Sequence, residues 1–116
     1  VGLLRLWALR PFPIDDLVQA VKGKRGIAVF DQDLSPGLGG IIYQEIAGAL
    51  YGTDDAPKLA SFIGGLGGKI PTDLDFEYMV KVLKENIPPN EPHLLMSKSD
   101  MELVKKQREI ALRGGV

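Results

Sequence analysis

Residues 26–40 read GIAVFDQDLSPGLGG, and this stretch decides the fold class. Its first five residues are apolar, as in a short strand that is covered on both faces. The polar, glycine-rich residues 31–40 predict a loop. Apolar residues then recur at the spacing of one helix face: Ile42, Ile46, Ala49 and Leu50. The stretch therefore predicts a strand, a loop and a helix that ends at Gly52.

The same order of elements is predicted upstream. Residues 2–9 (GLLRLWAL) form a short, nearly continuous apolar run that predicts a buried strand. A turn at residues 11–13 follows. One helix face is then predicted by four apolar residues: Ile14, Leu17, Val18 and Val21.

A third copy of the order is predicted downstream. Residues 58–63 (KLASFI) predict a strand, and Thr72 with Asp75 has the spacing of a capping box that opens a helix. The apolar face of that helix has four members: Phe76, Met79, Val80 and Leu83. Alternating strands and helices predict an α/β fold, with a three-layer, mostly parallel sheet and helices on both faces.

The chain divides into three parts in this interpretation. Residues 1–87 form a partial α/β domain, residues 88–98 form a Pro-rich linker, and residues 99–116 form a C-terminal helical tail. Ser99 and Glu102 have capping-box spacing at the start of the tail helix. Because three strands make a narrow sheet, we expect a further strand from upstream or from another chain.

The composition excludes several classes of protein. The 116 residues include no Cys and a single His, which removes thiolate metal sites, iron–sulfur ligation and Cys nucleophiles. A formal net charge of −1 gives no electrostatic basis for binding nucleic acid or a membrane surface. No apolar run reaches the roughly 18 residues of a spanning helix, and no charged leader precedes an apolar stretch. We therefore expect a cytoplasmic domain.

A repeated glycine motif supplies the first candidate site. The sequence Gly-Leu-Gly-Gly occurs at 37–40 and again at 65–68, each time after a predicted strand. Both copies therefore lie at the carboxyl edge of the sheet, where ligands usually bind. Neither copy fits a nucleotide fingerprint or a P-loop. Two interpretations stay open: an independent module that binds a phosphate or a CoA-like anion there, or tight turns packed under neighbouring elements.

Charged residues at the same edge allow further alternatives. Asp31 and Asp33 follow a strand, as in haloacid-dehalogenase phosphotransferases, but they can equally shape the loop by binding its backbone. Arg10 can contact an anion or pair with one of these two carboxylates. His93 is interpreted as a surface or packing residue.

Three motifs together resemble a known family. Residues 6–13 (LWALRPFP), 29–40 (VFDQDLSPGLGG) and 63–69 (IGGLGGK) resemble the alpha subunit of pyruvate:ferredoxin oxidoreductase, or pyruvate synthase. The likeness spans residues 1 to about 85 and is to the second domain of that subunit, which is similar to the transketolase C-terminal domain. It implies that a first strand–helix unit precedes residue 1.

The resemblance also implies a function. The family converts pyruvate, CoA and oxidised ferredoxin to acetyl-CoA, CO2 and reduced ferredoxin, using thiamine diphosphate, Mg²⁺ and Fe–S clusters. Those cofactors are held by other subunits or domains, and domains of this type carry no catalytic residue. We therefore expect an assembly domain that contacts thiamine-binding and ferredoxin-like subunits and holds no cofactor or metal itself.

The residues carried over are interface or binding candidates. They are Arg10, Phe12, Asp31, Asp33, Ser35, Gly37, Gly39, Gly40, Gly65, Gly67, Gly68 and Lys69. The chain departs from the family at Gln32, where Arg is common, and at Lys69-Ile70, where Arg-Asp is common. Lys69 keeps the charge of Arg without its bidentate geometry.

Overall fold

The computed structural model describes residues 1–85 and 91–114. The elements run in the order α1 (Ile14–Val21), β1 (Gly26–Asp31), α2 (Ile41–Leu50), β2 (Lys58–Ile63), the 3₁₀ turn η1 (Leu66–Gly68), α3 (Asp73–Lys84), β3 (His93–Leu94) and α4 (Lys98–Gly114). Between residues 14 and 84 this order is the predicted one, and β2 has the predicted bounds.

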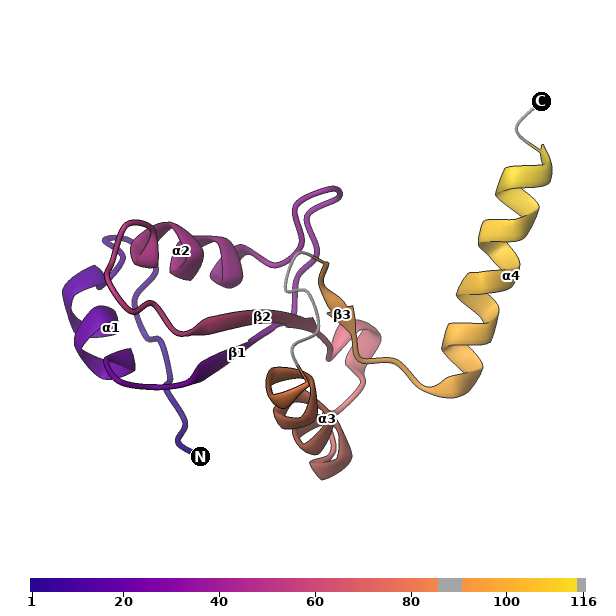
Figure 1. Cartoon of the computed structure of the whole chain (residues 1–116). Coiled ribbons are helices and arrows are strands. Elements are labelled where there is room, and N and C mark those ends of the chain that lie inside the picture. The colour runs from indigo at the N-terminus through magenta and orange to yellow at the C-terminus, as the bar shows by residue number, and fades with distance from the viewer. Residues whose placement is uncertain (86–90, 115–116) are drawn as a thin grey trace.

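The sheet is parallel throughout and has the order β1-β2-β3. Helices α1 and α2 lie on one side of it, and α3 lies on the other (Figure 1). The α/β fold with helices on both faces is therefore confirmed. Because parallel strands end at the same edge, both Gly-Leu-Gly-Gly loops leave the sheet together.

Two apolar clusters, one on each face of the sheet, hold these layers together. The cluster under α1 and α2 consists of Leu17, Val21, Val29, Ile46 and Leu50. The cluster under α3 consists of Ala60, Phe62, Met79 and Val82. Phe62 has 0% of its surface exposed, so the second cluster is centred on β2.

The predicted strand at residues 2–9 is wrong. These residues take part in no ladder of the sheet that the structure describes, and Leu3 and Trp7 are 91% and 88% exposed. An apolar run indicates that its side chains favour burial. A strand also needs a neighbouring strand to which its backbone can hydrogen-bond, and a local sequence pattern does not show whether one is present. Leu6 alone of this run packs against the cluster under α1 and α2.

Helix α3 buries the predicted face only in part. Its capping box is present, with the Thr72 N–H donating to Asp75 Oδ2 at 2.7 Å. Of the predicted face, Met79 is buried and Leu83 packs against the same cluster, whereas Phe76 remains 49% exposed. Val82, which lies outside the predicted face, is also buried.

Part of the predicted linker at residues 88–98 pairs with the sheet. Residues 86–90 lie outside the described part, but His93 and Leu94 pair with Phe62 and Ile63 as β3. This two-residue strand supplies the third strand that residues 2–9 were expected to supply. It was missed because two residues between prolines and a polar segment carry no strand pattern.

Helix α4 projects away from the body of the domain (Figure 1). It begins at Lys98, one residue before the predicted tail, and the Asp100 N–H donates to Ser97 Oγ at 3.3 Å. Ser97 therefore occupies the capping position that we predicted for Ser99. None of the residues of α4 is buried.

Candidate interface at the carboxyl edge of the sheet

The two glycine loops begin side by side. Asp31 and Ile63, the last residues of β1 and β2, are partners in the register. The Gly64 N–H donates to the Asp31 carbonyl at 3.0 Å, which extends the ladder by one bond into the second loop. The sequence prediction that both loops meet at one edge is thus correct.

Asp31 is the buried centre of this edge. Its side chain is 2% exposed, Oδ1 accepts the Ile42 N–H at 3.1 Å, and Oδ2 accepts the Tyr43 N–H at 3.1 Å. Asp33 Oδ2 accepts the Ile41 N–H at 3.2 Å. Two carboxylates therefore satisfy the first N–H groups of α2 and sit at the positive end of its dipole.

Burial has an electrostatic cost at this position. Desolvation raises the pKa of the Asp31 carboxyl above its ordinary value, and the hydrogen bonds from Tyr43 and Ile42 lower it in part. The charge of Asp33 raises the pKa further. Both carboxylates bind backbone N–H groups, as one of the two interpretations predicts, but these groups belong to the start of α2 and not to the loop. A nucleophilic role for Asp31 finds no support, because its oxygens point into the helix terminus.

The first glycine loop is a tight hairpin. The Ser35 N–H donates to the Gly39 carbonyl at 2.9 Å, and the Gly39 N–H returns to the Ser35 carbonyl at 3.0 Å. Gly37 and Gly39 have φ values of 79° and 85°, which a residue with a side chain rarely adopts. Gly39 also lies against Pro92. Packed turns therefore account for this motif.

Two other glycines allow close approach at this edge, one across the first loop and one between the two loops. A Cβ at Gly40 would overlap the Asp31 carboxylate, and a Cβ at Gly65 would lie 2.5 Å from Gln32 Nε2. Gln32 therefore lies against the backbone of the second loop. In that loop, Gly67 and Gly68 also have positive φ values.

Both cations expected at this edge are paired. Arg10 Nη2 lies 2.6 Å from Glu45 Oε1 on α2, so its partner is neither Asp31 nor Asp33. Lys69 forms an ion pair with Asp100 at the start of α4. Neither partner could be identified from the sequence, because Glu45 and Asp100 lie far along the chain and carry no local signal.

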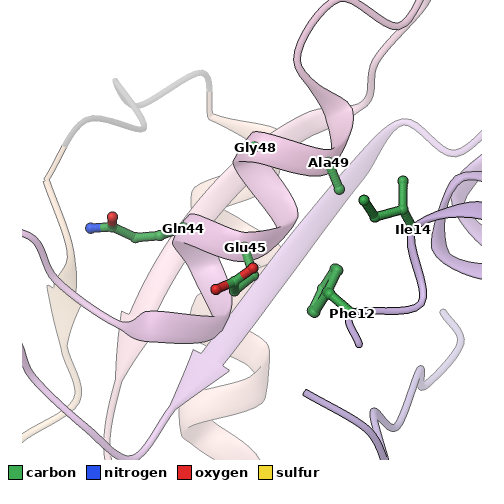
Figure 2. Close-up of a pocket in the computed structure, with 6 residues that line it drawn as sticks. All are labelled: Phe12, Ile14, Gln44, Glu45, Gly48 and Ala49. Atoms are coloured by element: carbon green, nitrogen blue, oxygen red, sulfur yellow. The ribbon is translucent and has the colours of Figure 1, made fainter. Parts of the chain in front are cut away.

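A shallow groove lies between the Arg10–Pro13 segment and α2. It has a volume of about 360 Å³, and Phe12 and Ile14 face Ala49 and Glu45 across it (Figure 2). Gly48 widens it, because a Cβ there would meet nothing within 4 Å. The groove is apolar on its floor, and the Arg10–Glu45 ion pair lies at its rim.

His93 is a packing residue, as expected. Its ring stacks on Phe62 at a centroid distance of 5.1 Å, and Nδ1 lies 3.3 Å from the Tyr78 hydroxyl. The ring thereby fixes β3 against α3.

The described residues contain no cluster of side chains suited to a metal ion. Within residues 1–85 and 91–114, no three His, Cys, Asp or Glu side chains come together as a metal site would need. Both oxygens of Asp31 are already engaged by the backbone of α2. In the same ranges, no helix has the length and apolar character to cross a bilayer.

Comparison with known proteins now decides the family. Residues 1–76 match the family described as "Pyruvate:ferredoxin oxidoreductase core domain II". The chain belongs to this family. The resemblance based on the three loop motifs is thereby confirmed, and α4 lies beyond the residues that the core domain II family matches.

Curated relatives support the same assignment. The chain is 33% identical over 90 residues to pyruvate synthase subunit PorA of Thermotoga maritima, which covers 78% of this chain and 22% of the relative. It is 37% identical over 87 residues to ketoisovalerate oxidoreductase subunit VorA of Pyrococcus furiosus, covering 75% and 22%. The chain therefore spans about a fifth of the length of these core domain II relatives.

Proposed function

We propose that this chain is a non-catalytic assembly domain of a thiamine diphosphate-dependent 2-oxoacid:ferredoxin oxidoreductase. The observation that carries the proposal is that both oxygens of Asp31 accept backbone N–H groups at the start of α2. The domain in which this occurs belongs to the oxidoreductase core domain II family. At the edge where α/β proteins usually bind ligands, the carboxylates hold the domain's own helix. Lys69 and Arg10 are likewise paired within the chain.

The proposed reaction is the oxidative decarboxylation of a 2-oxoacid. It gives CO2 and an acyl-CoA, and the electrons pass to ferredoxin. The relatives' names support this class of substrate, because they include a pyruvate synthase and a ketoisovalerate oxidoreductase. The chain's own residues position neighbouring parts of the enzyme and take no part in bond making.

In this proposal, the cofactors of the enzyme bind to other subunits or domains and not to this chain. Thiamine diphosphate, Mg²⁺, Fe–S clusters and CoA would be held by other subunits or domains, with which this cytoplasmic domain assembles. Support comes from the absence of Cys in the sequence and from the engagement of Asp31 described above. The groove beside Phe12 is the surface that we assign to a partner, because its apolar floor is open to solvent on the domain itself.

The test is association with a thiamine-binding subunit. Gly48→Arg would fill the groove without strain, since residue 48 lies inside α2 with open space around it. Tyr51→Arg adds the same group to a position that is 92% exposed and outside the groove. We expect the first variant to lose co-purification and the second to keep it, with equal circular dichroism. Equal retention by both variants contradicts the assignment of the groove, and no association by the wild type contradicts the proposed function.

A further inference from the structure

The edge of the sheet opposite the glycine loops is basic. Strands β1 and β2 start there side by side, because they pair in parallel register (Figure 1). Helix α3 ends there too, since Lys58 Nζ donates to the Leu83 carbonyl at 3.1 Å. We define this amino edge as residues 22–25, 54–58 and 81–85, which include six Lys or Arg and three Asp or Glu. Its net charge is therefore +3, whereas the remaining residues together carry −4.

Four cations of the amino edge reach into solvent. Lys22, Lys24, Arg25 and Lys84 are exposed, and none of them forms an ion pair within residues 1–85 and 91–114. We call these four side chains the basic patch. Because no carboxylate of the described chain neutralises them directly, their charge is available to a partner.

The helix dipoles account for only half of the basic patch. Lys22 and Lys84 lie at the C-terminal ends of α1 and α3, where a positive charge is favoured. Lys24 and Arg25 lie further on, in the turn between α1 and β1, and a helix dipole acts mainly within its last turn. Both side chains are exposed, so neither the helix end nor the core explains their charge.

The patch fits a partner that binds briefly and through charge. Permanent interfaces have an apolar core, but the amino edge exposes no large apolar side chain, and the nearest one before residue 54 is Tyr51. Electron-transfer encounters, in contrast, bury little surface and are steered by opposite charges. Among the partners in the proposed reaction, ferredoxin is the one that must bind and leave in each turnover.

We propose that the basic patch is a docking surface for an acidic face of the ferredoxin that accepts the electrons. This inference rests on the proposed function and adds the surface through which this chain serves it. Opposite charges raise the rate at which the two proteins meet and orient them. The patch therefore affects ferredoxin binding and leaves the decarboxylation of the 2-oxoacid unchanged.

Steady-state kinetics of the assembled enzyme test the surface. Lys24→Glu combined with Arg25→Glu should raise the KM for ferredoxin about tenfold at low ionic strength, with kcat and the KM for the 2-oxoacid unchanged. Lys24→Gln combined with Arg25→Gln should give an intermediate KM. The differences should vanish in about 1 M salt, where charges are screened beyond about 3 Å.

A matched charge reversal elsewhere on the chain separates docking from total charge. Lys105→Glu combined with Lys106→Glu changes two exposed cations on α4 and should leave the KM for ferredoxin at the wild-type value. An unchanged KM in the Lys24/Arg25 variant, an equal rise in the α4 variant, or a rise that persists in high salt would overturn the proposal. A wild-type complex that reduces no ferredoxin would contradict the proposed function itself, whereas equal KM values in an active complex would contradict the docking surface alone.

Discussion

The Asp31 carboxylate occupies the space that a Cβ at Gly40 would take. Asp31 reaches the N–H groups of Ile42 and Tyr43 through this gap. The last residue of β1 thus holds the first turn of α2 across the polar loop between them. These two hydrogen bonds link the sheet to α2, the helix that forms one wall of the proposed interface.

Gly40→Ala should therefore destabilise the domain by about 2–4 kcal/mol, since either the methyl group or the buried carboxylate must move and leave hydrogen bonds unmade. Chemical denaturation with urea measures the change. Gly48→Ala is the matched control: it removes a glycine from the interior of the same helix, has open space, and should stabilise by about 0.5–1 kcal/mol. Equal changes in unfolding free energy for the two substitutions would contradict the role given to the close contact between Gly40 and Asp31.

The pH dependence of stability should report the burial of Asp31. Its pKa is raised above 3.8, chiefly by desolvation, so the folded chain holds the proton more tightly than the unfolded chain does. The resulting stabilisation is complete below the unfolded value and is lost as pH rises through the folded value.

Asp31→Asn removes this titration while keeping the shape of the side chain. We expect the stability of the wild type relative to this variant to be greatest in acid and to fall as pH rises towards neutrality. Urea unfolding of both proteins across that range measures the difference. A relative stability that rises with pH would mean that the pKa is lowered, contrary to the account.

Helix α4 should depend on Ser97 and not on Ser99. Ser97→Ala removes the hydroxyl that accepts the Asp100 N–H, and the loss of such a cap costs about 1 kcal/mol. Circular dichroism should show lower helix content for this variant at intermediate temperature. Ser99→Ala should leave the helix content unchanged, and the opposite result would restore the cap predicted from the sequence.

The Arg10–Glu45 ion pair should contribute little to stability. The Arg10 side chain is 67% exposed, and exposed pairs typically contribute less than about 1 kcal/mol. Glu45→Gln should change the unfolding free energy by less than that amount at low salt and by nothing measurable at high salt. A larger, salt-independent loss would show that Glu45 supports the fold in another way.

Local patterns predicted most of the fold. The helical spacing from Ile14, the apolar run of β2 and the capping box at Thr72 are each short-range signals, and each gave the observed element. The misses depend on distant partners. A strand at residues 2–9 needs a neighbour that its own residues do not encode, and β3 exists because Phe62 and Ile63 provide an open edge.

In the candidate site, too, features set by the local sequence could be predicted, and features that depend on distant partners could not. The Gly-Leu-Gly-Gly motif at 37–40 and Asp31 could be placed at the sheet edge, because strand order and loop position follow from the chain itself. The pairing of Arg10 with Glu45 and of Lys69 with Asp100 could not, because helix orientation decides those partners. The division into residues 1–87, 88–98 and 99–116 stays a prediction.

The central claim is that this domain assembles the enzyme and takes no part in its chemistry. The most direct measurement is 2-oxoacid-dependent ferredoxin reduction per assembled complex, with assembly quantified separately by sedimentation. Asp31→Asn and Lys69→Ala should lower the fraction assembled and leave turnover per complex at the wild-type value. Normal assembly with turnover lost in either variant would contradict the account, because it would place a residue of this edge in the reaction itself.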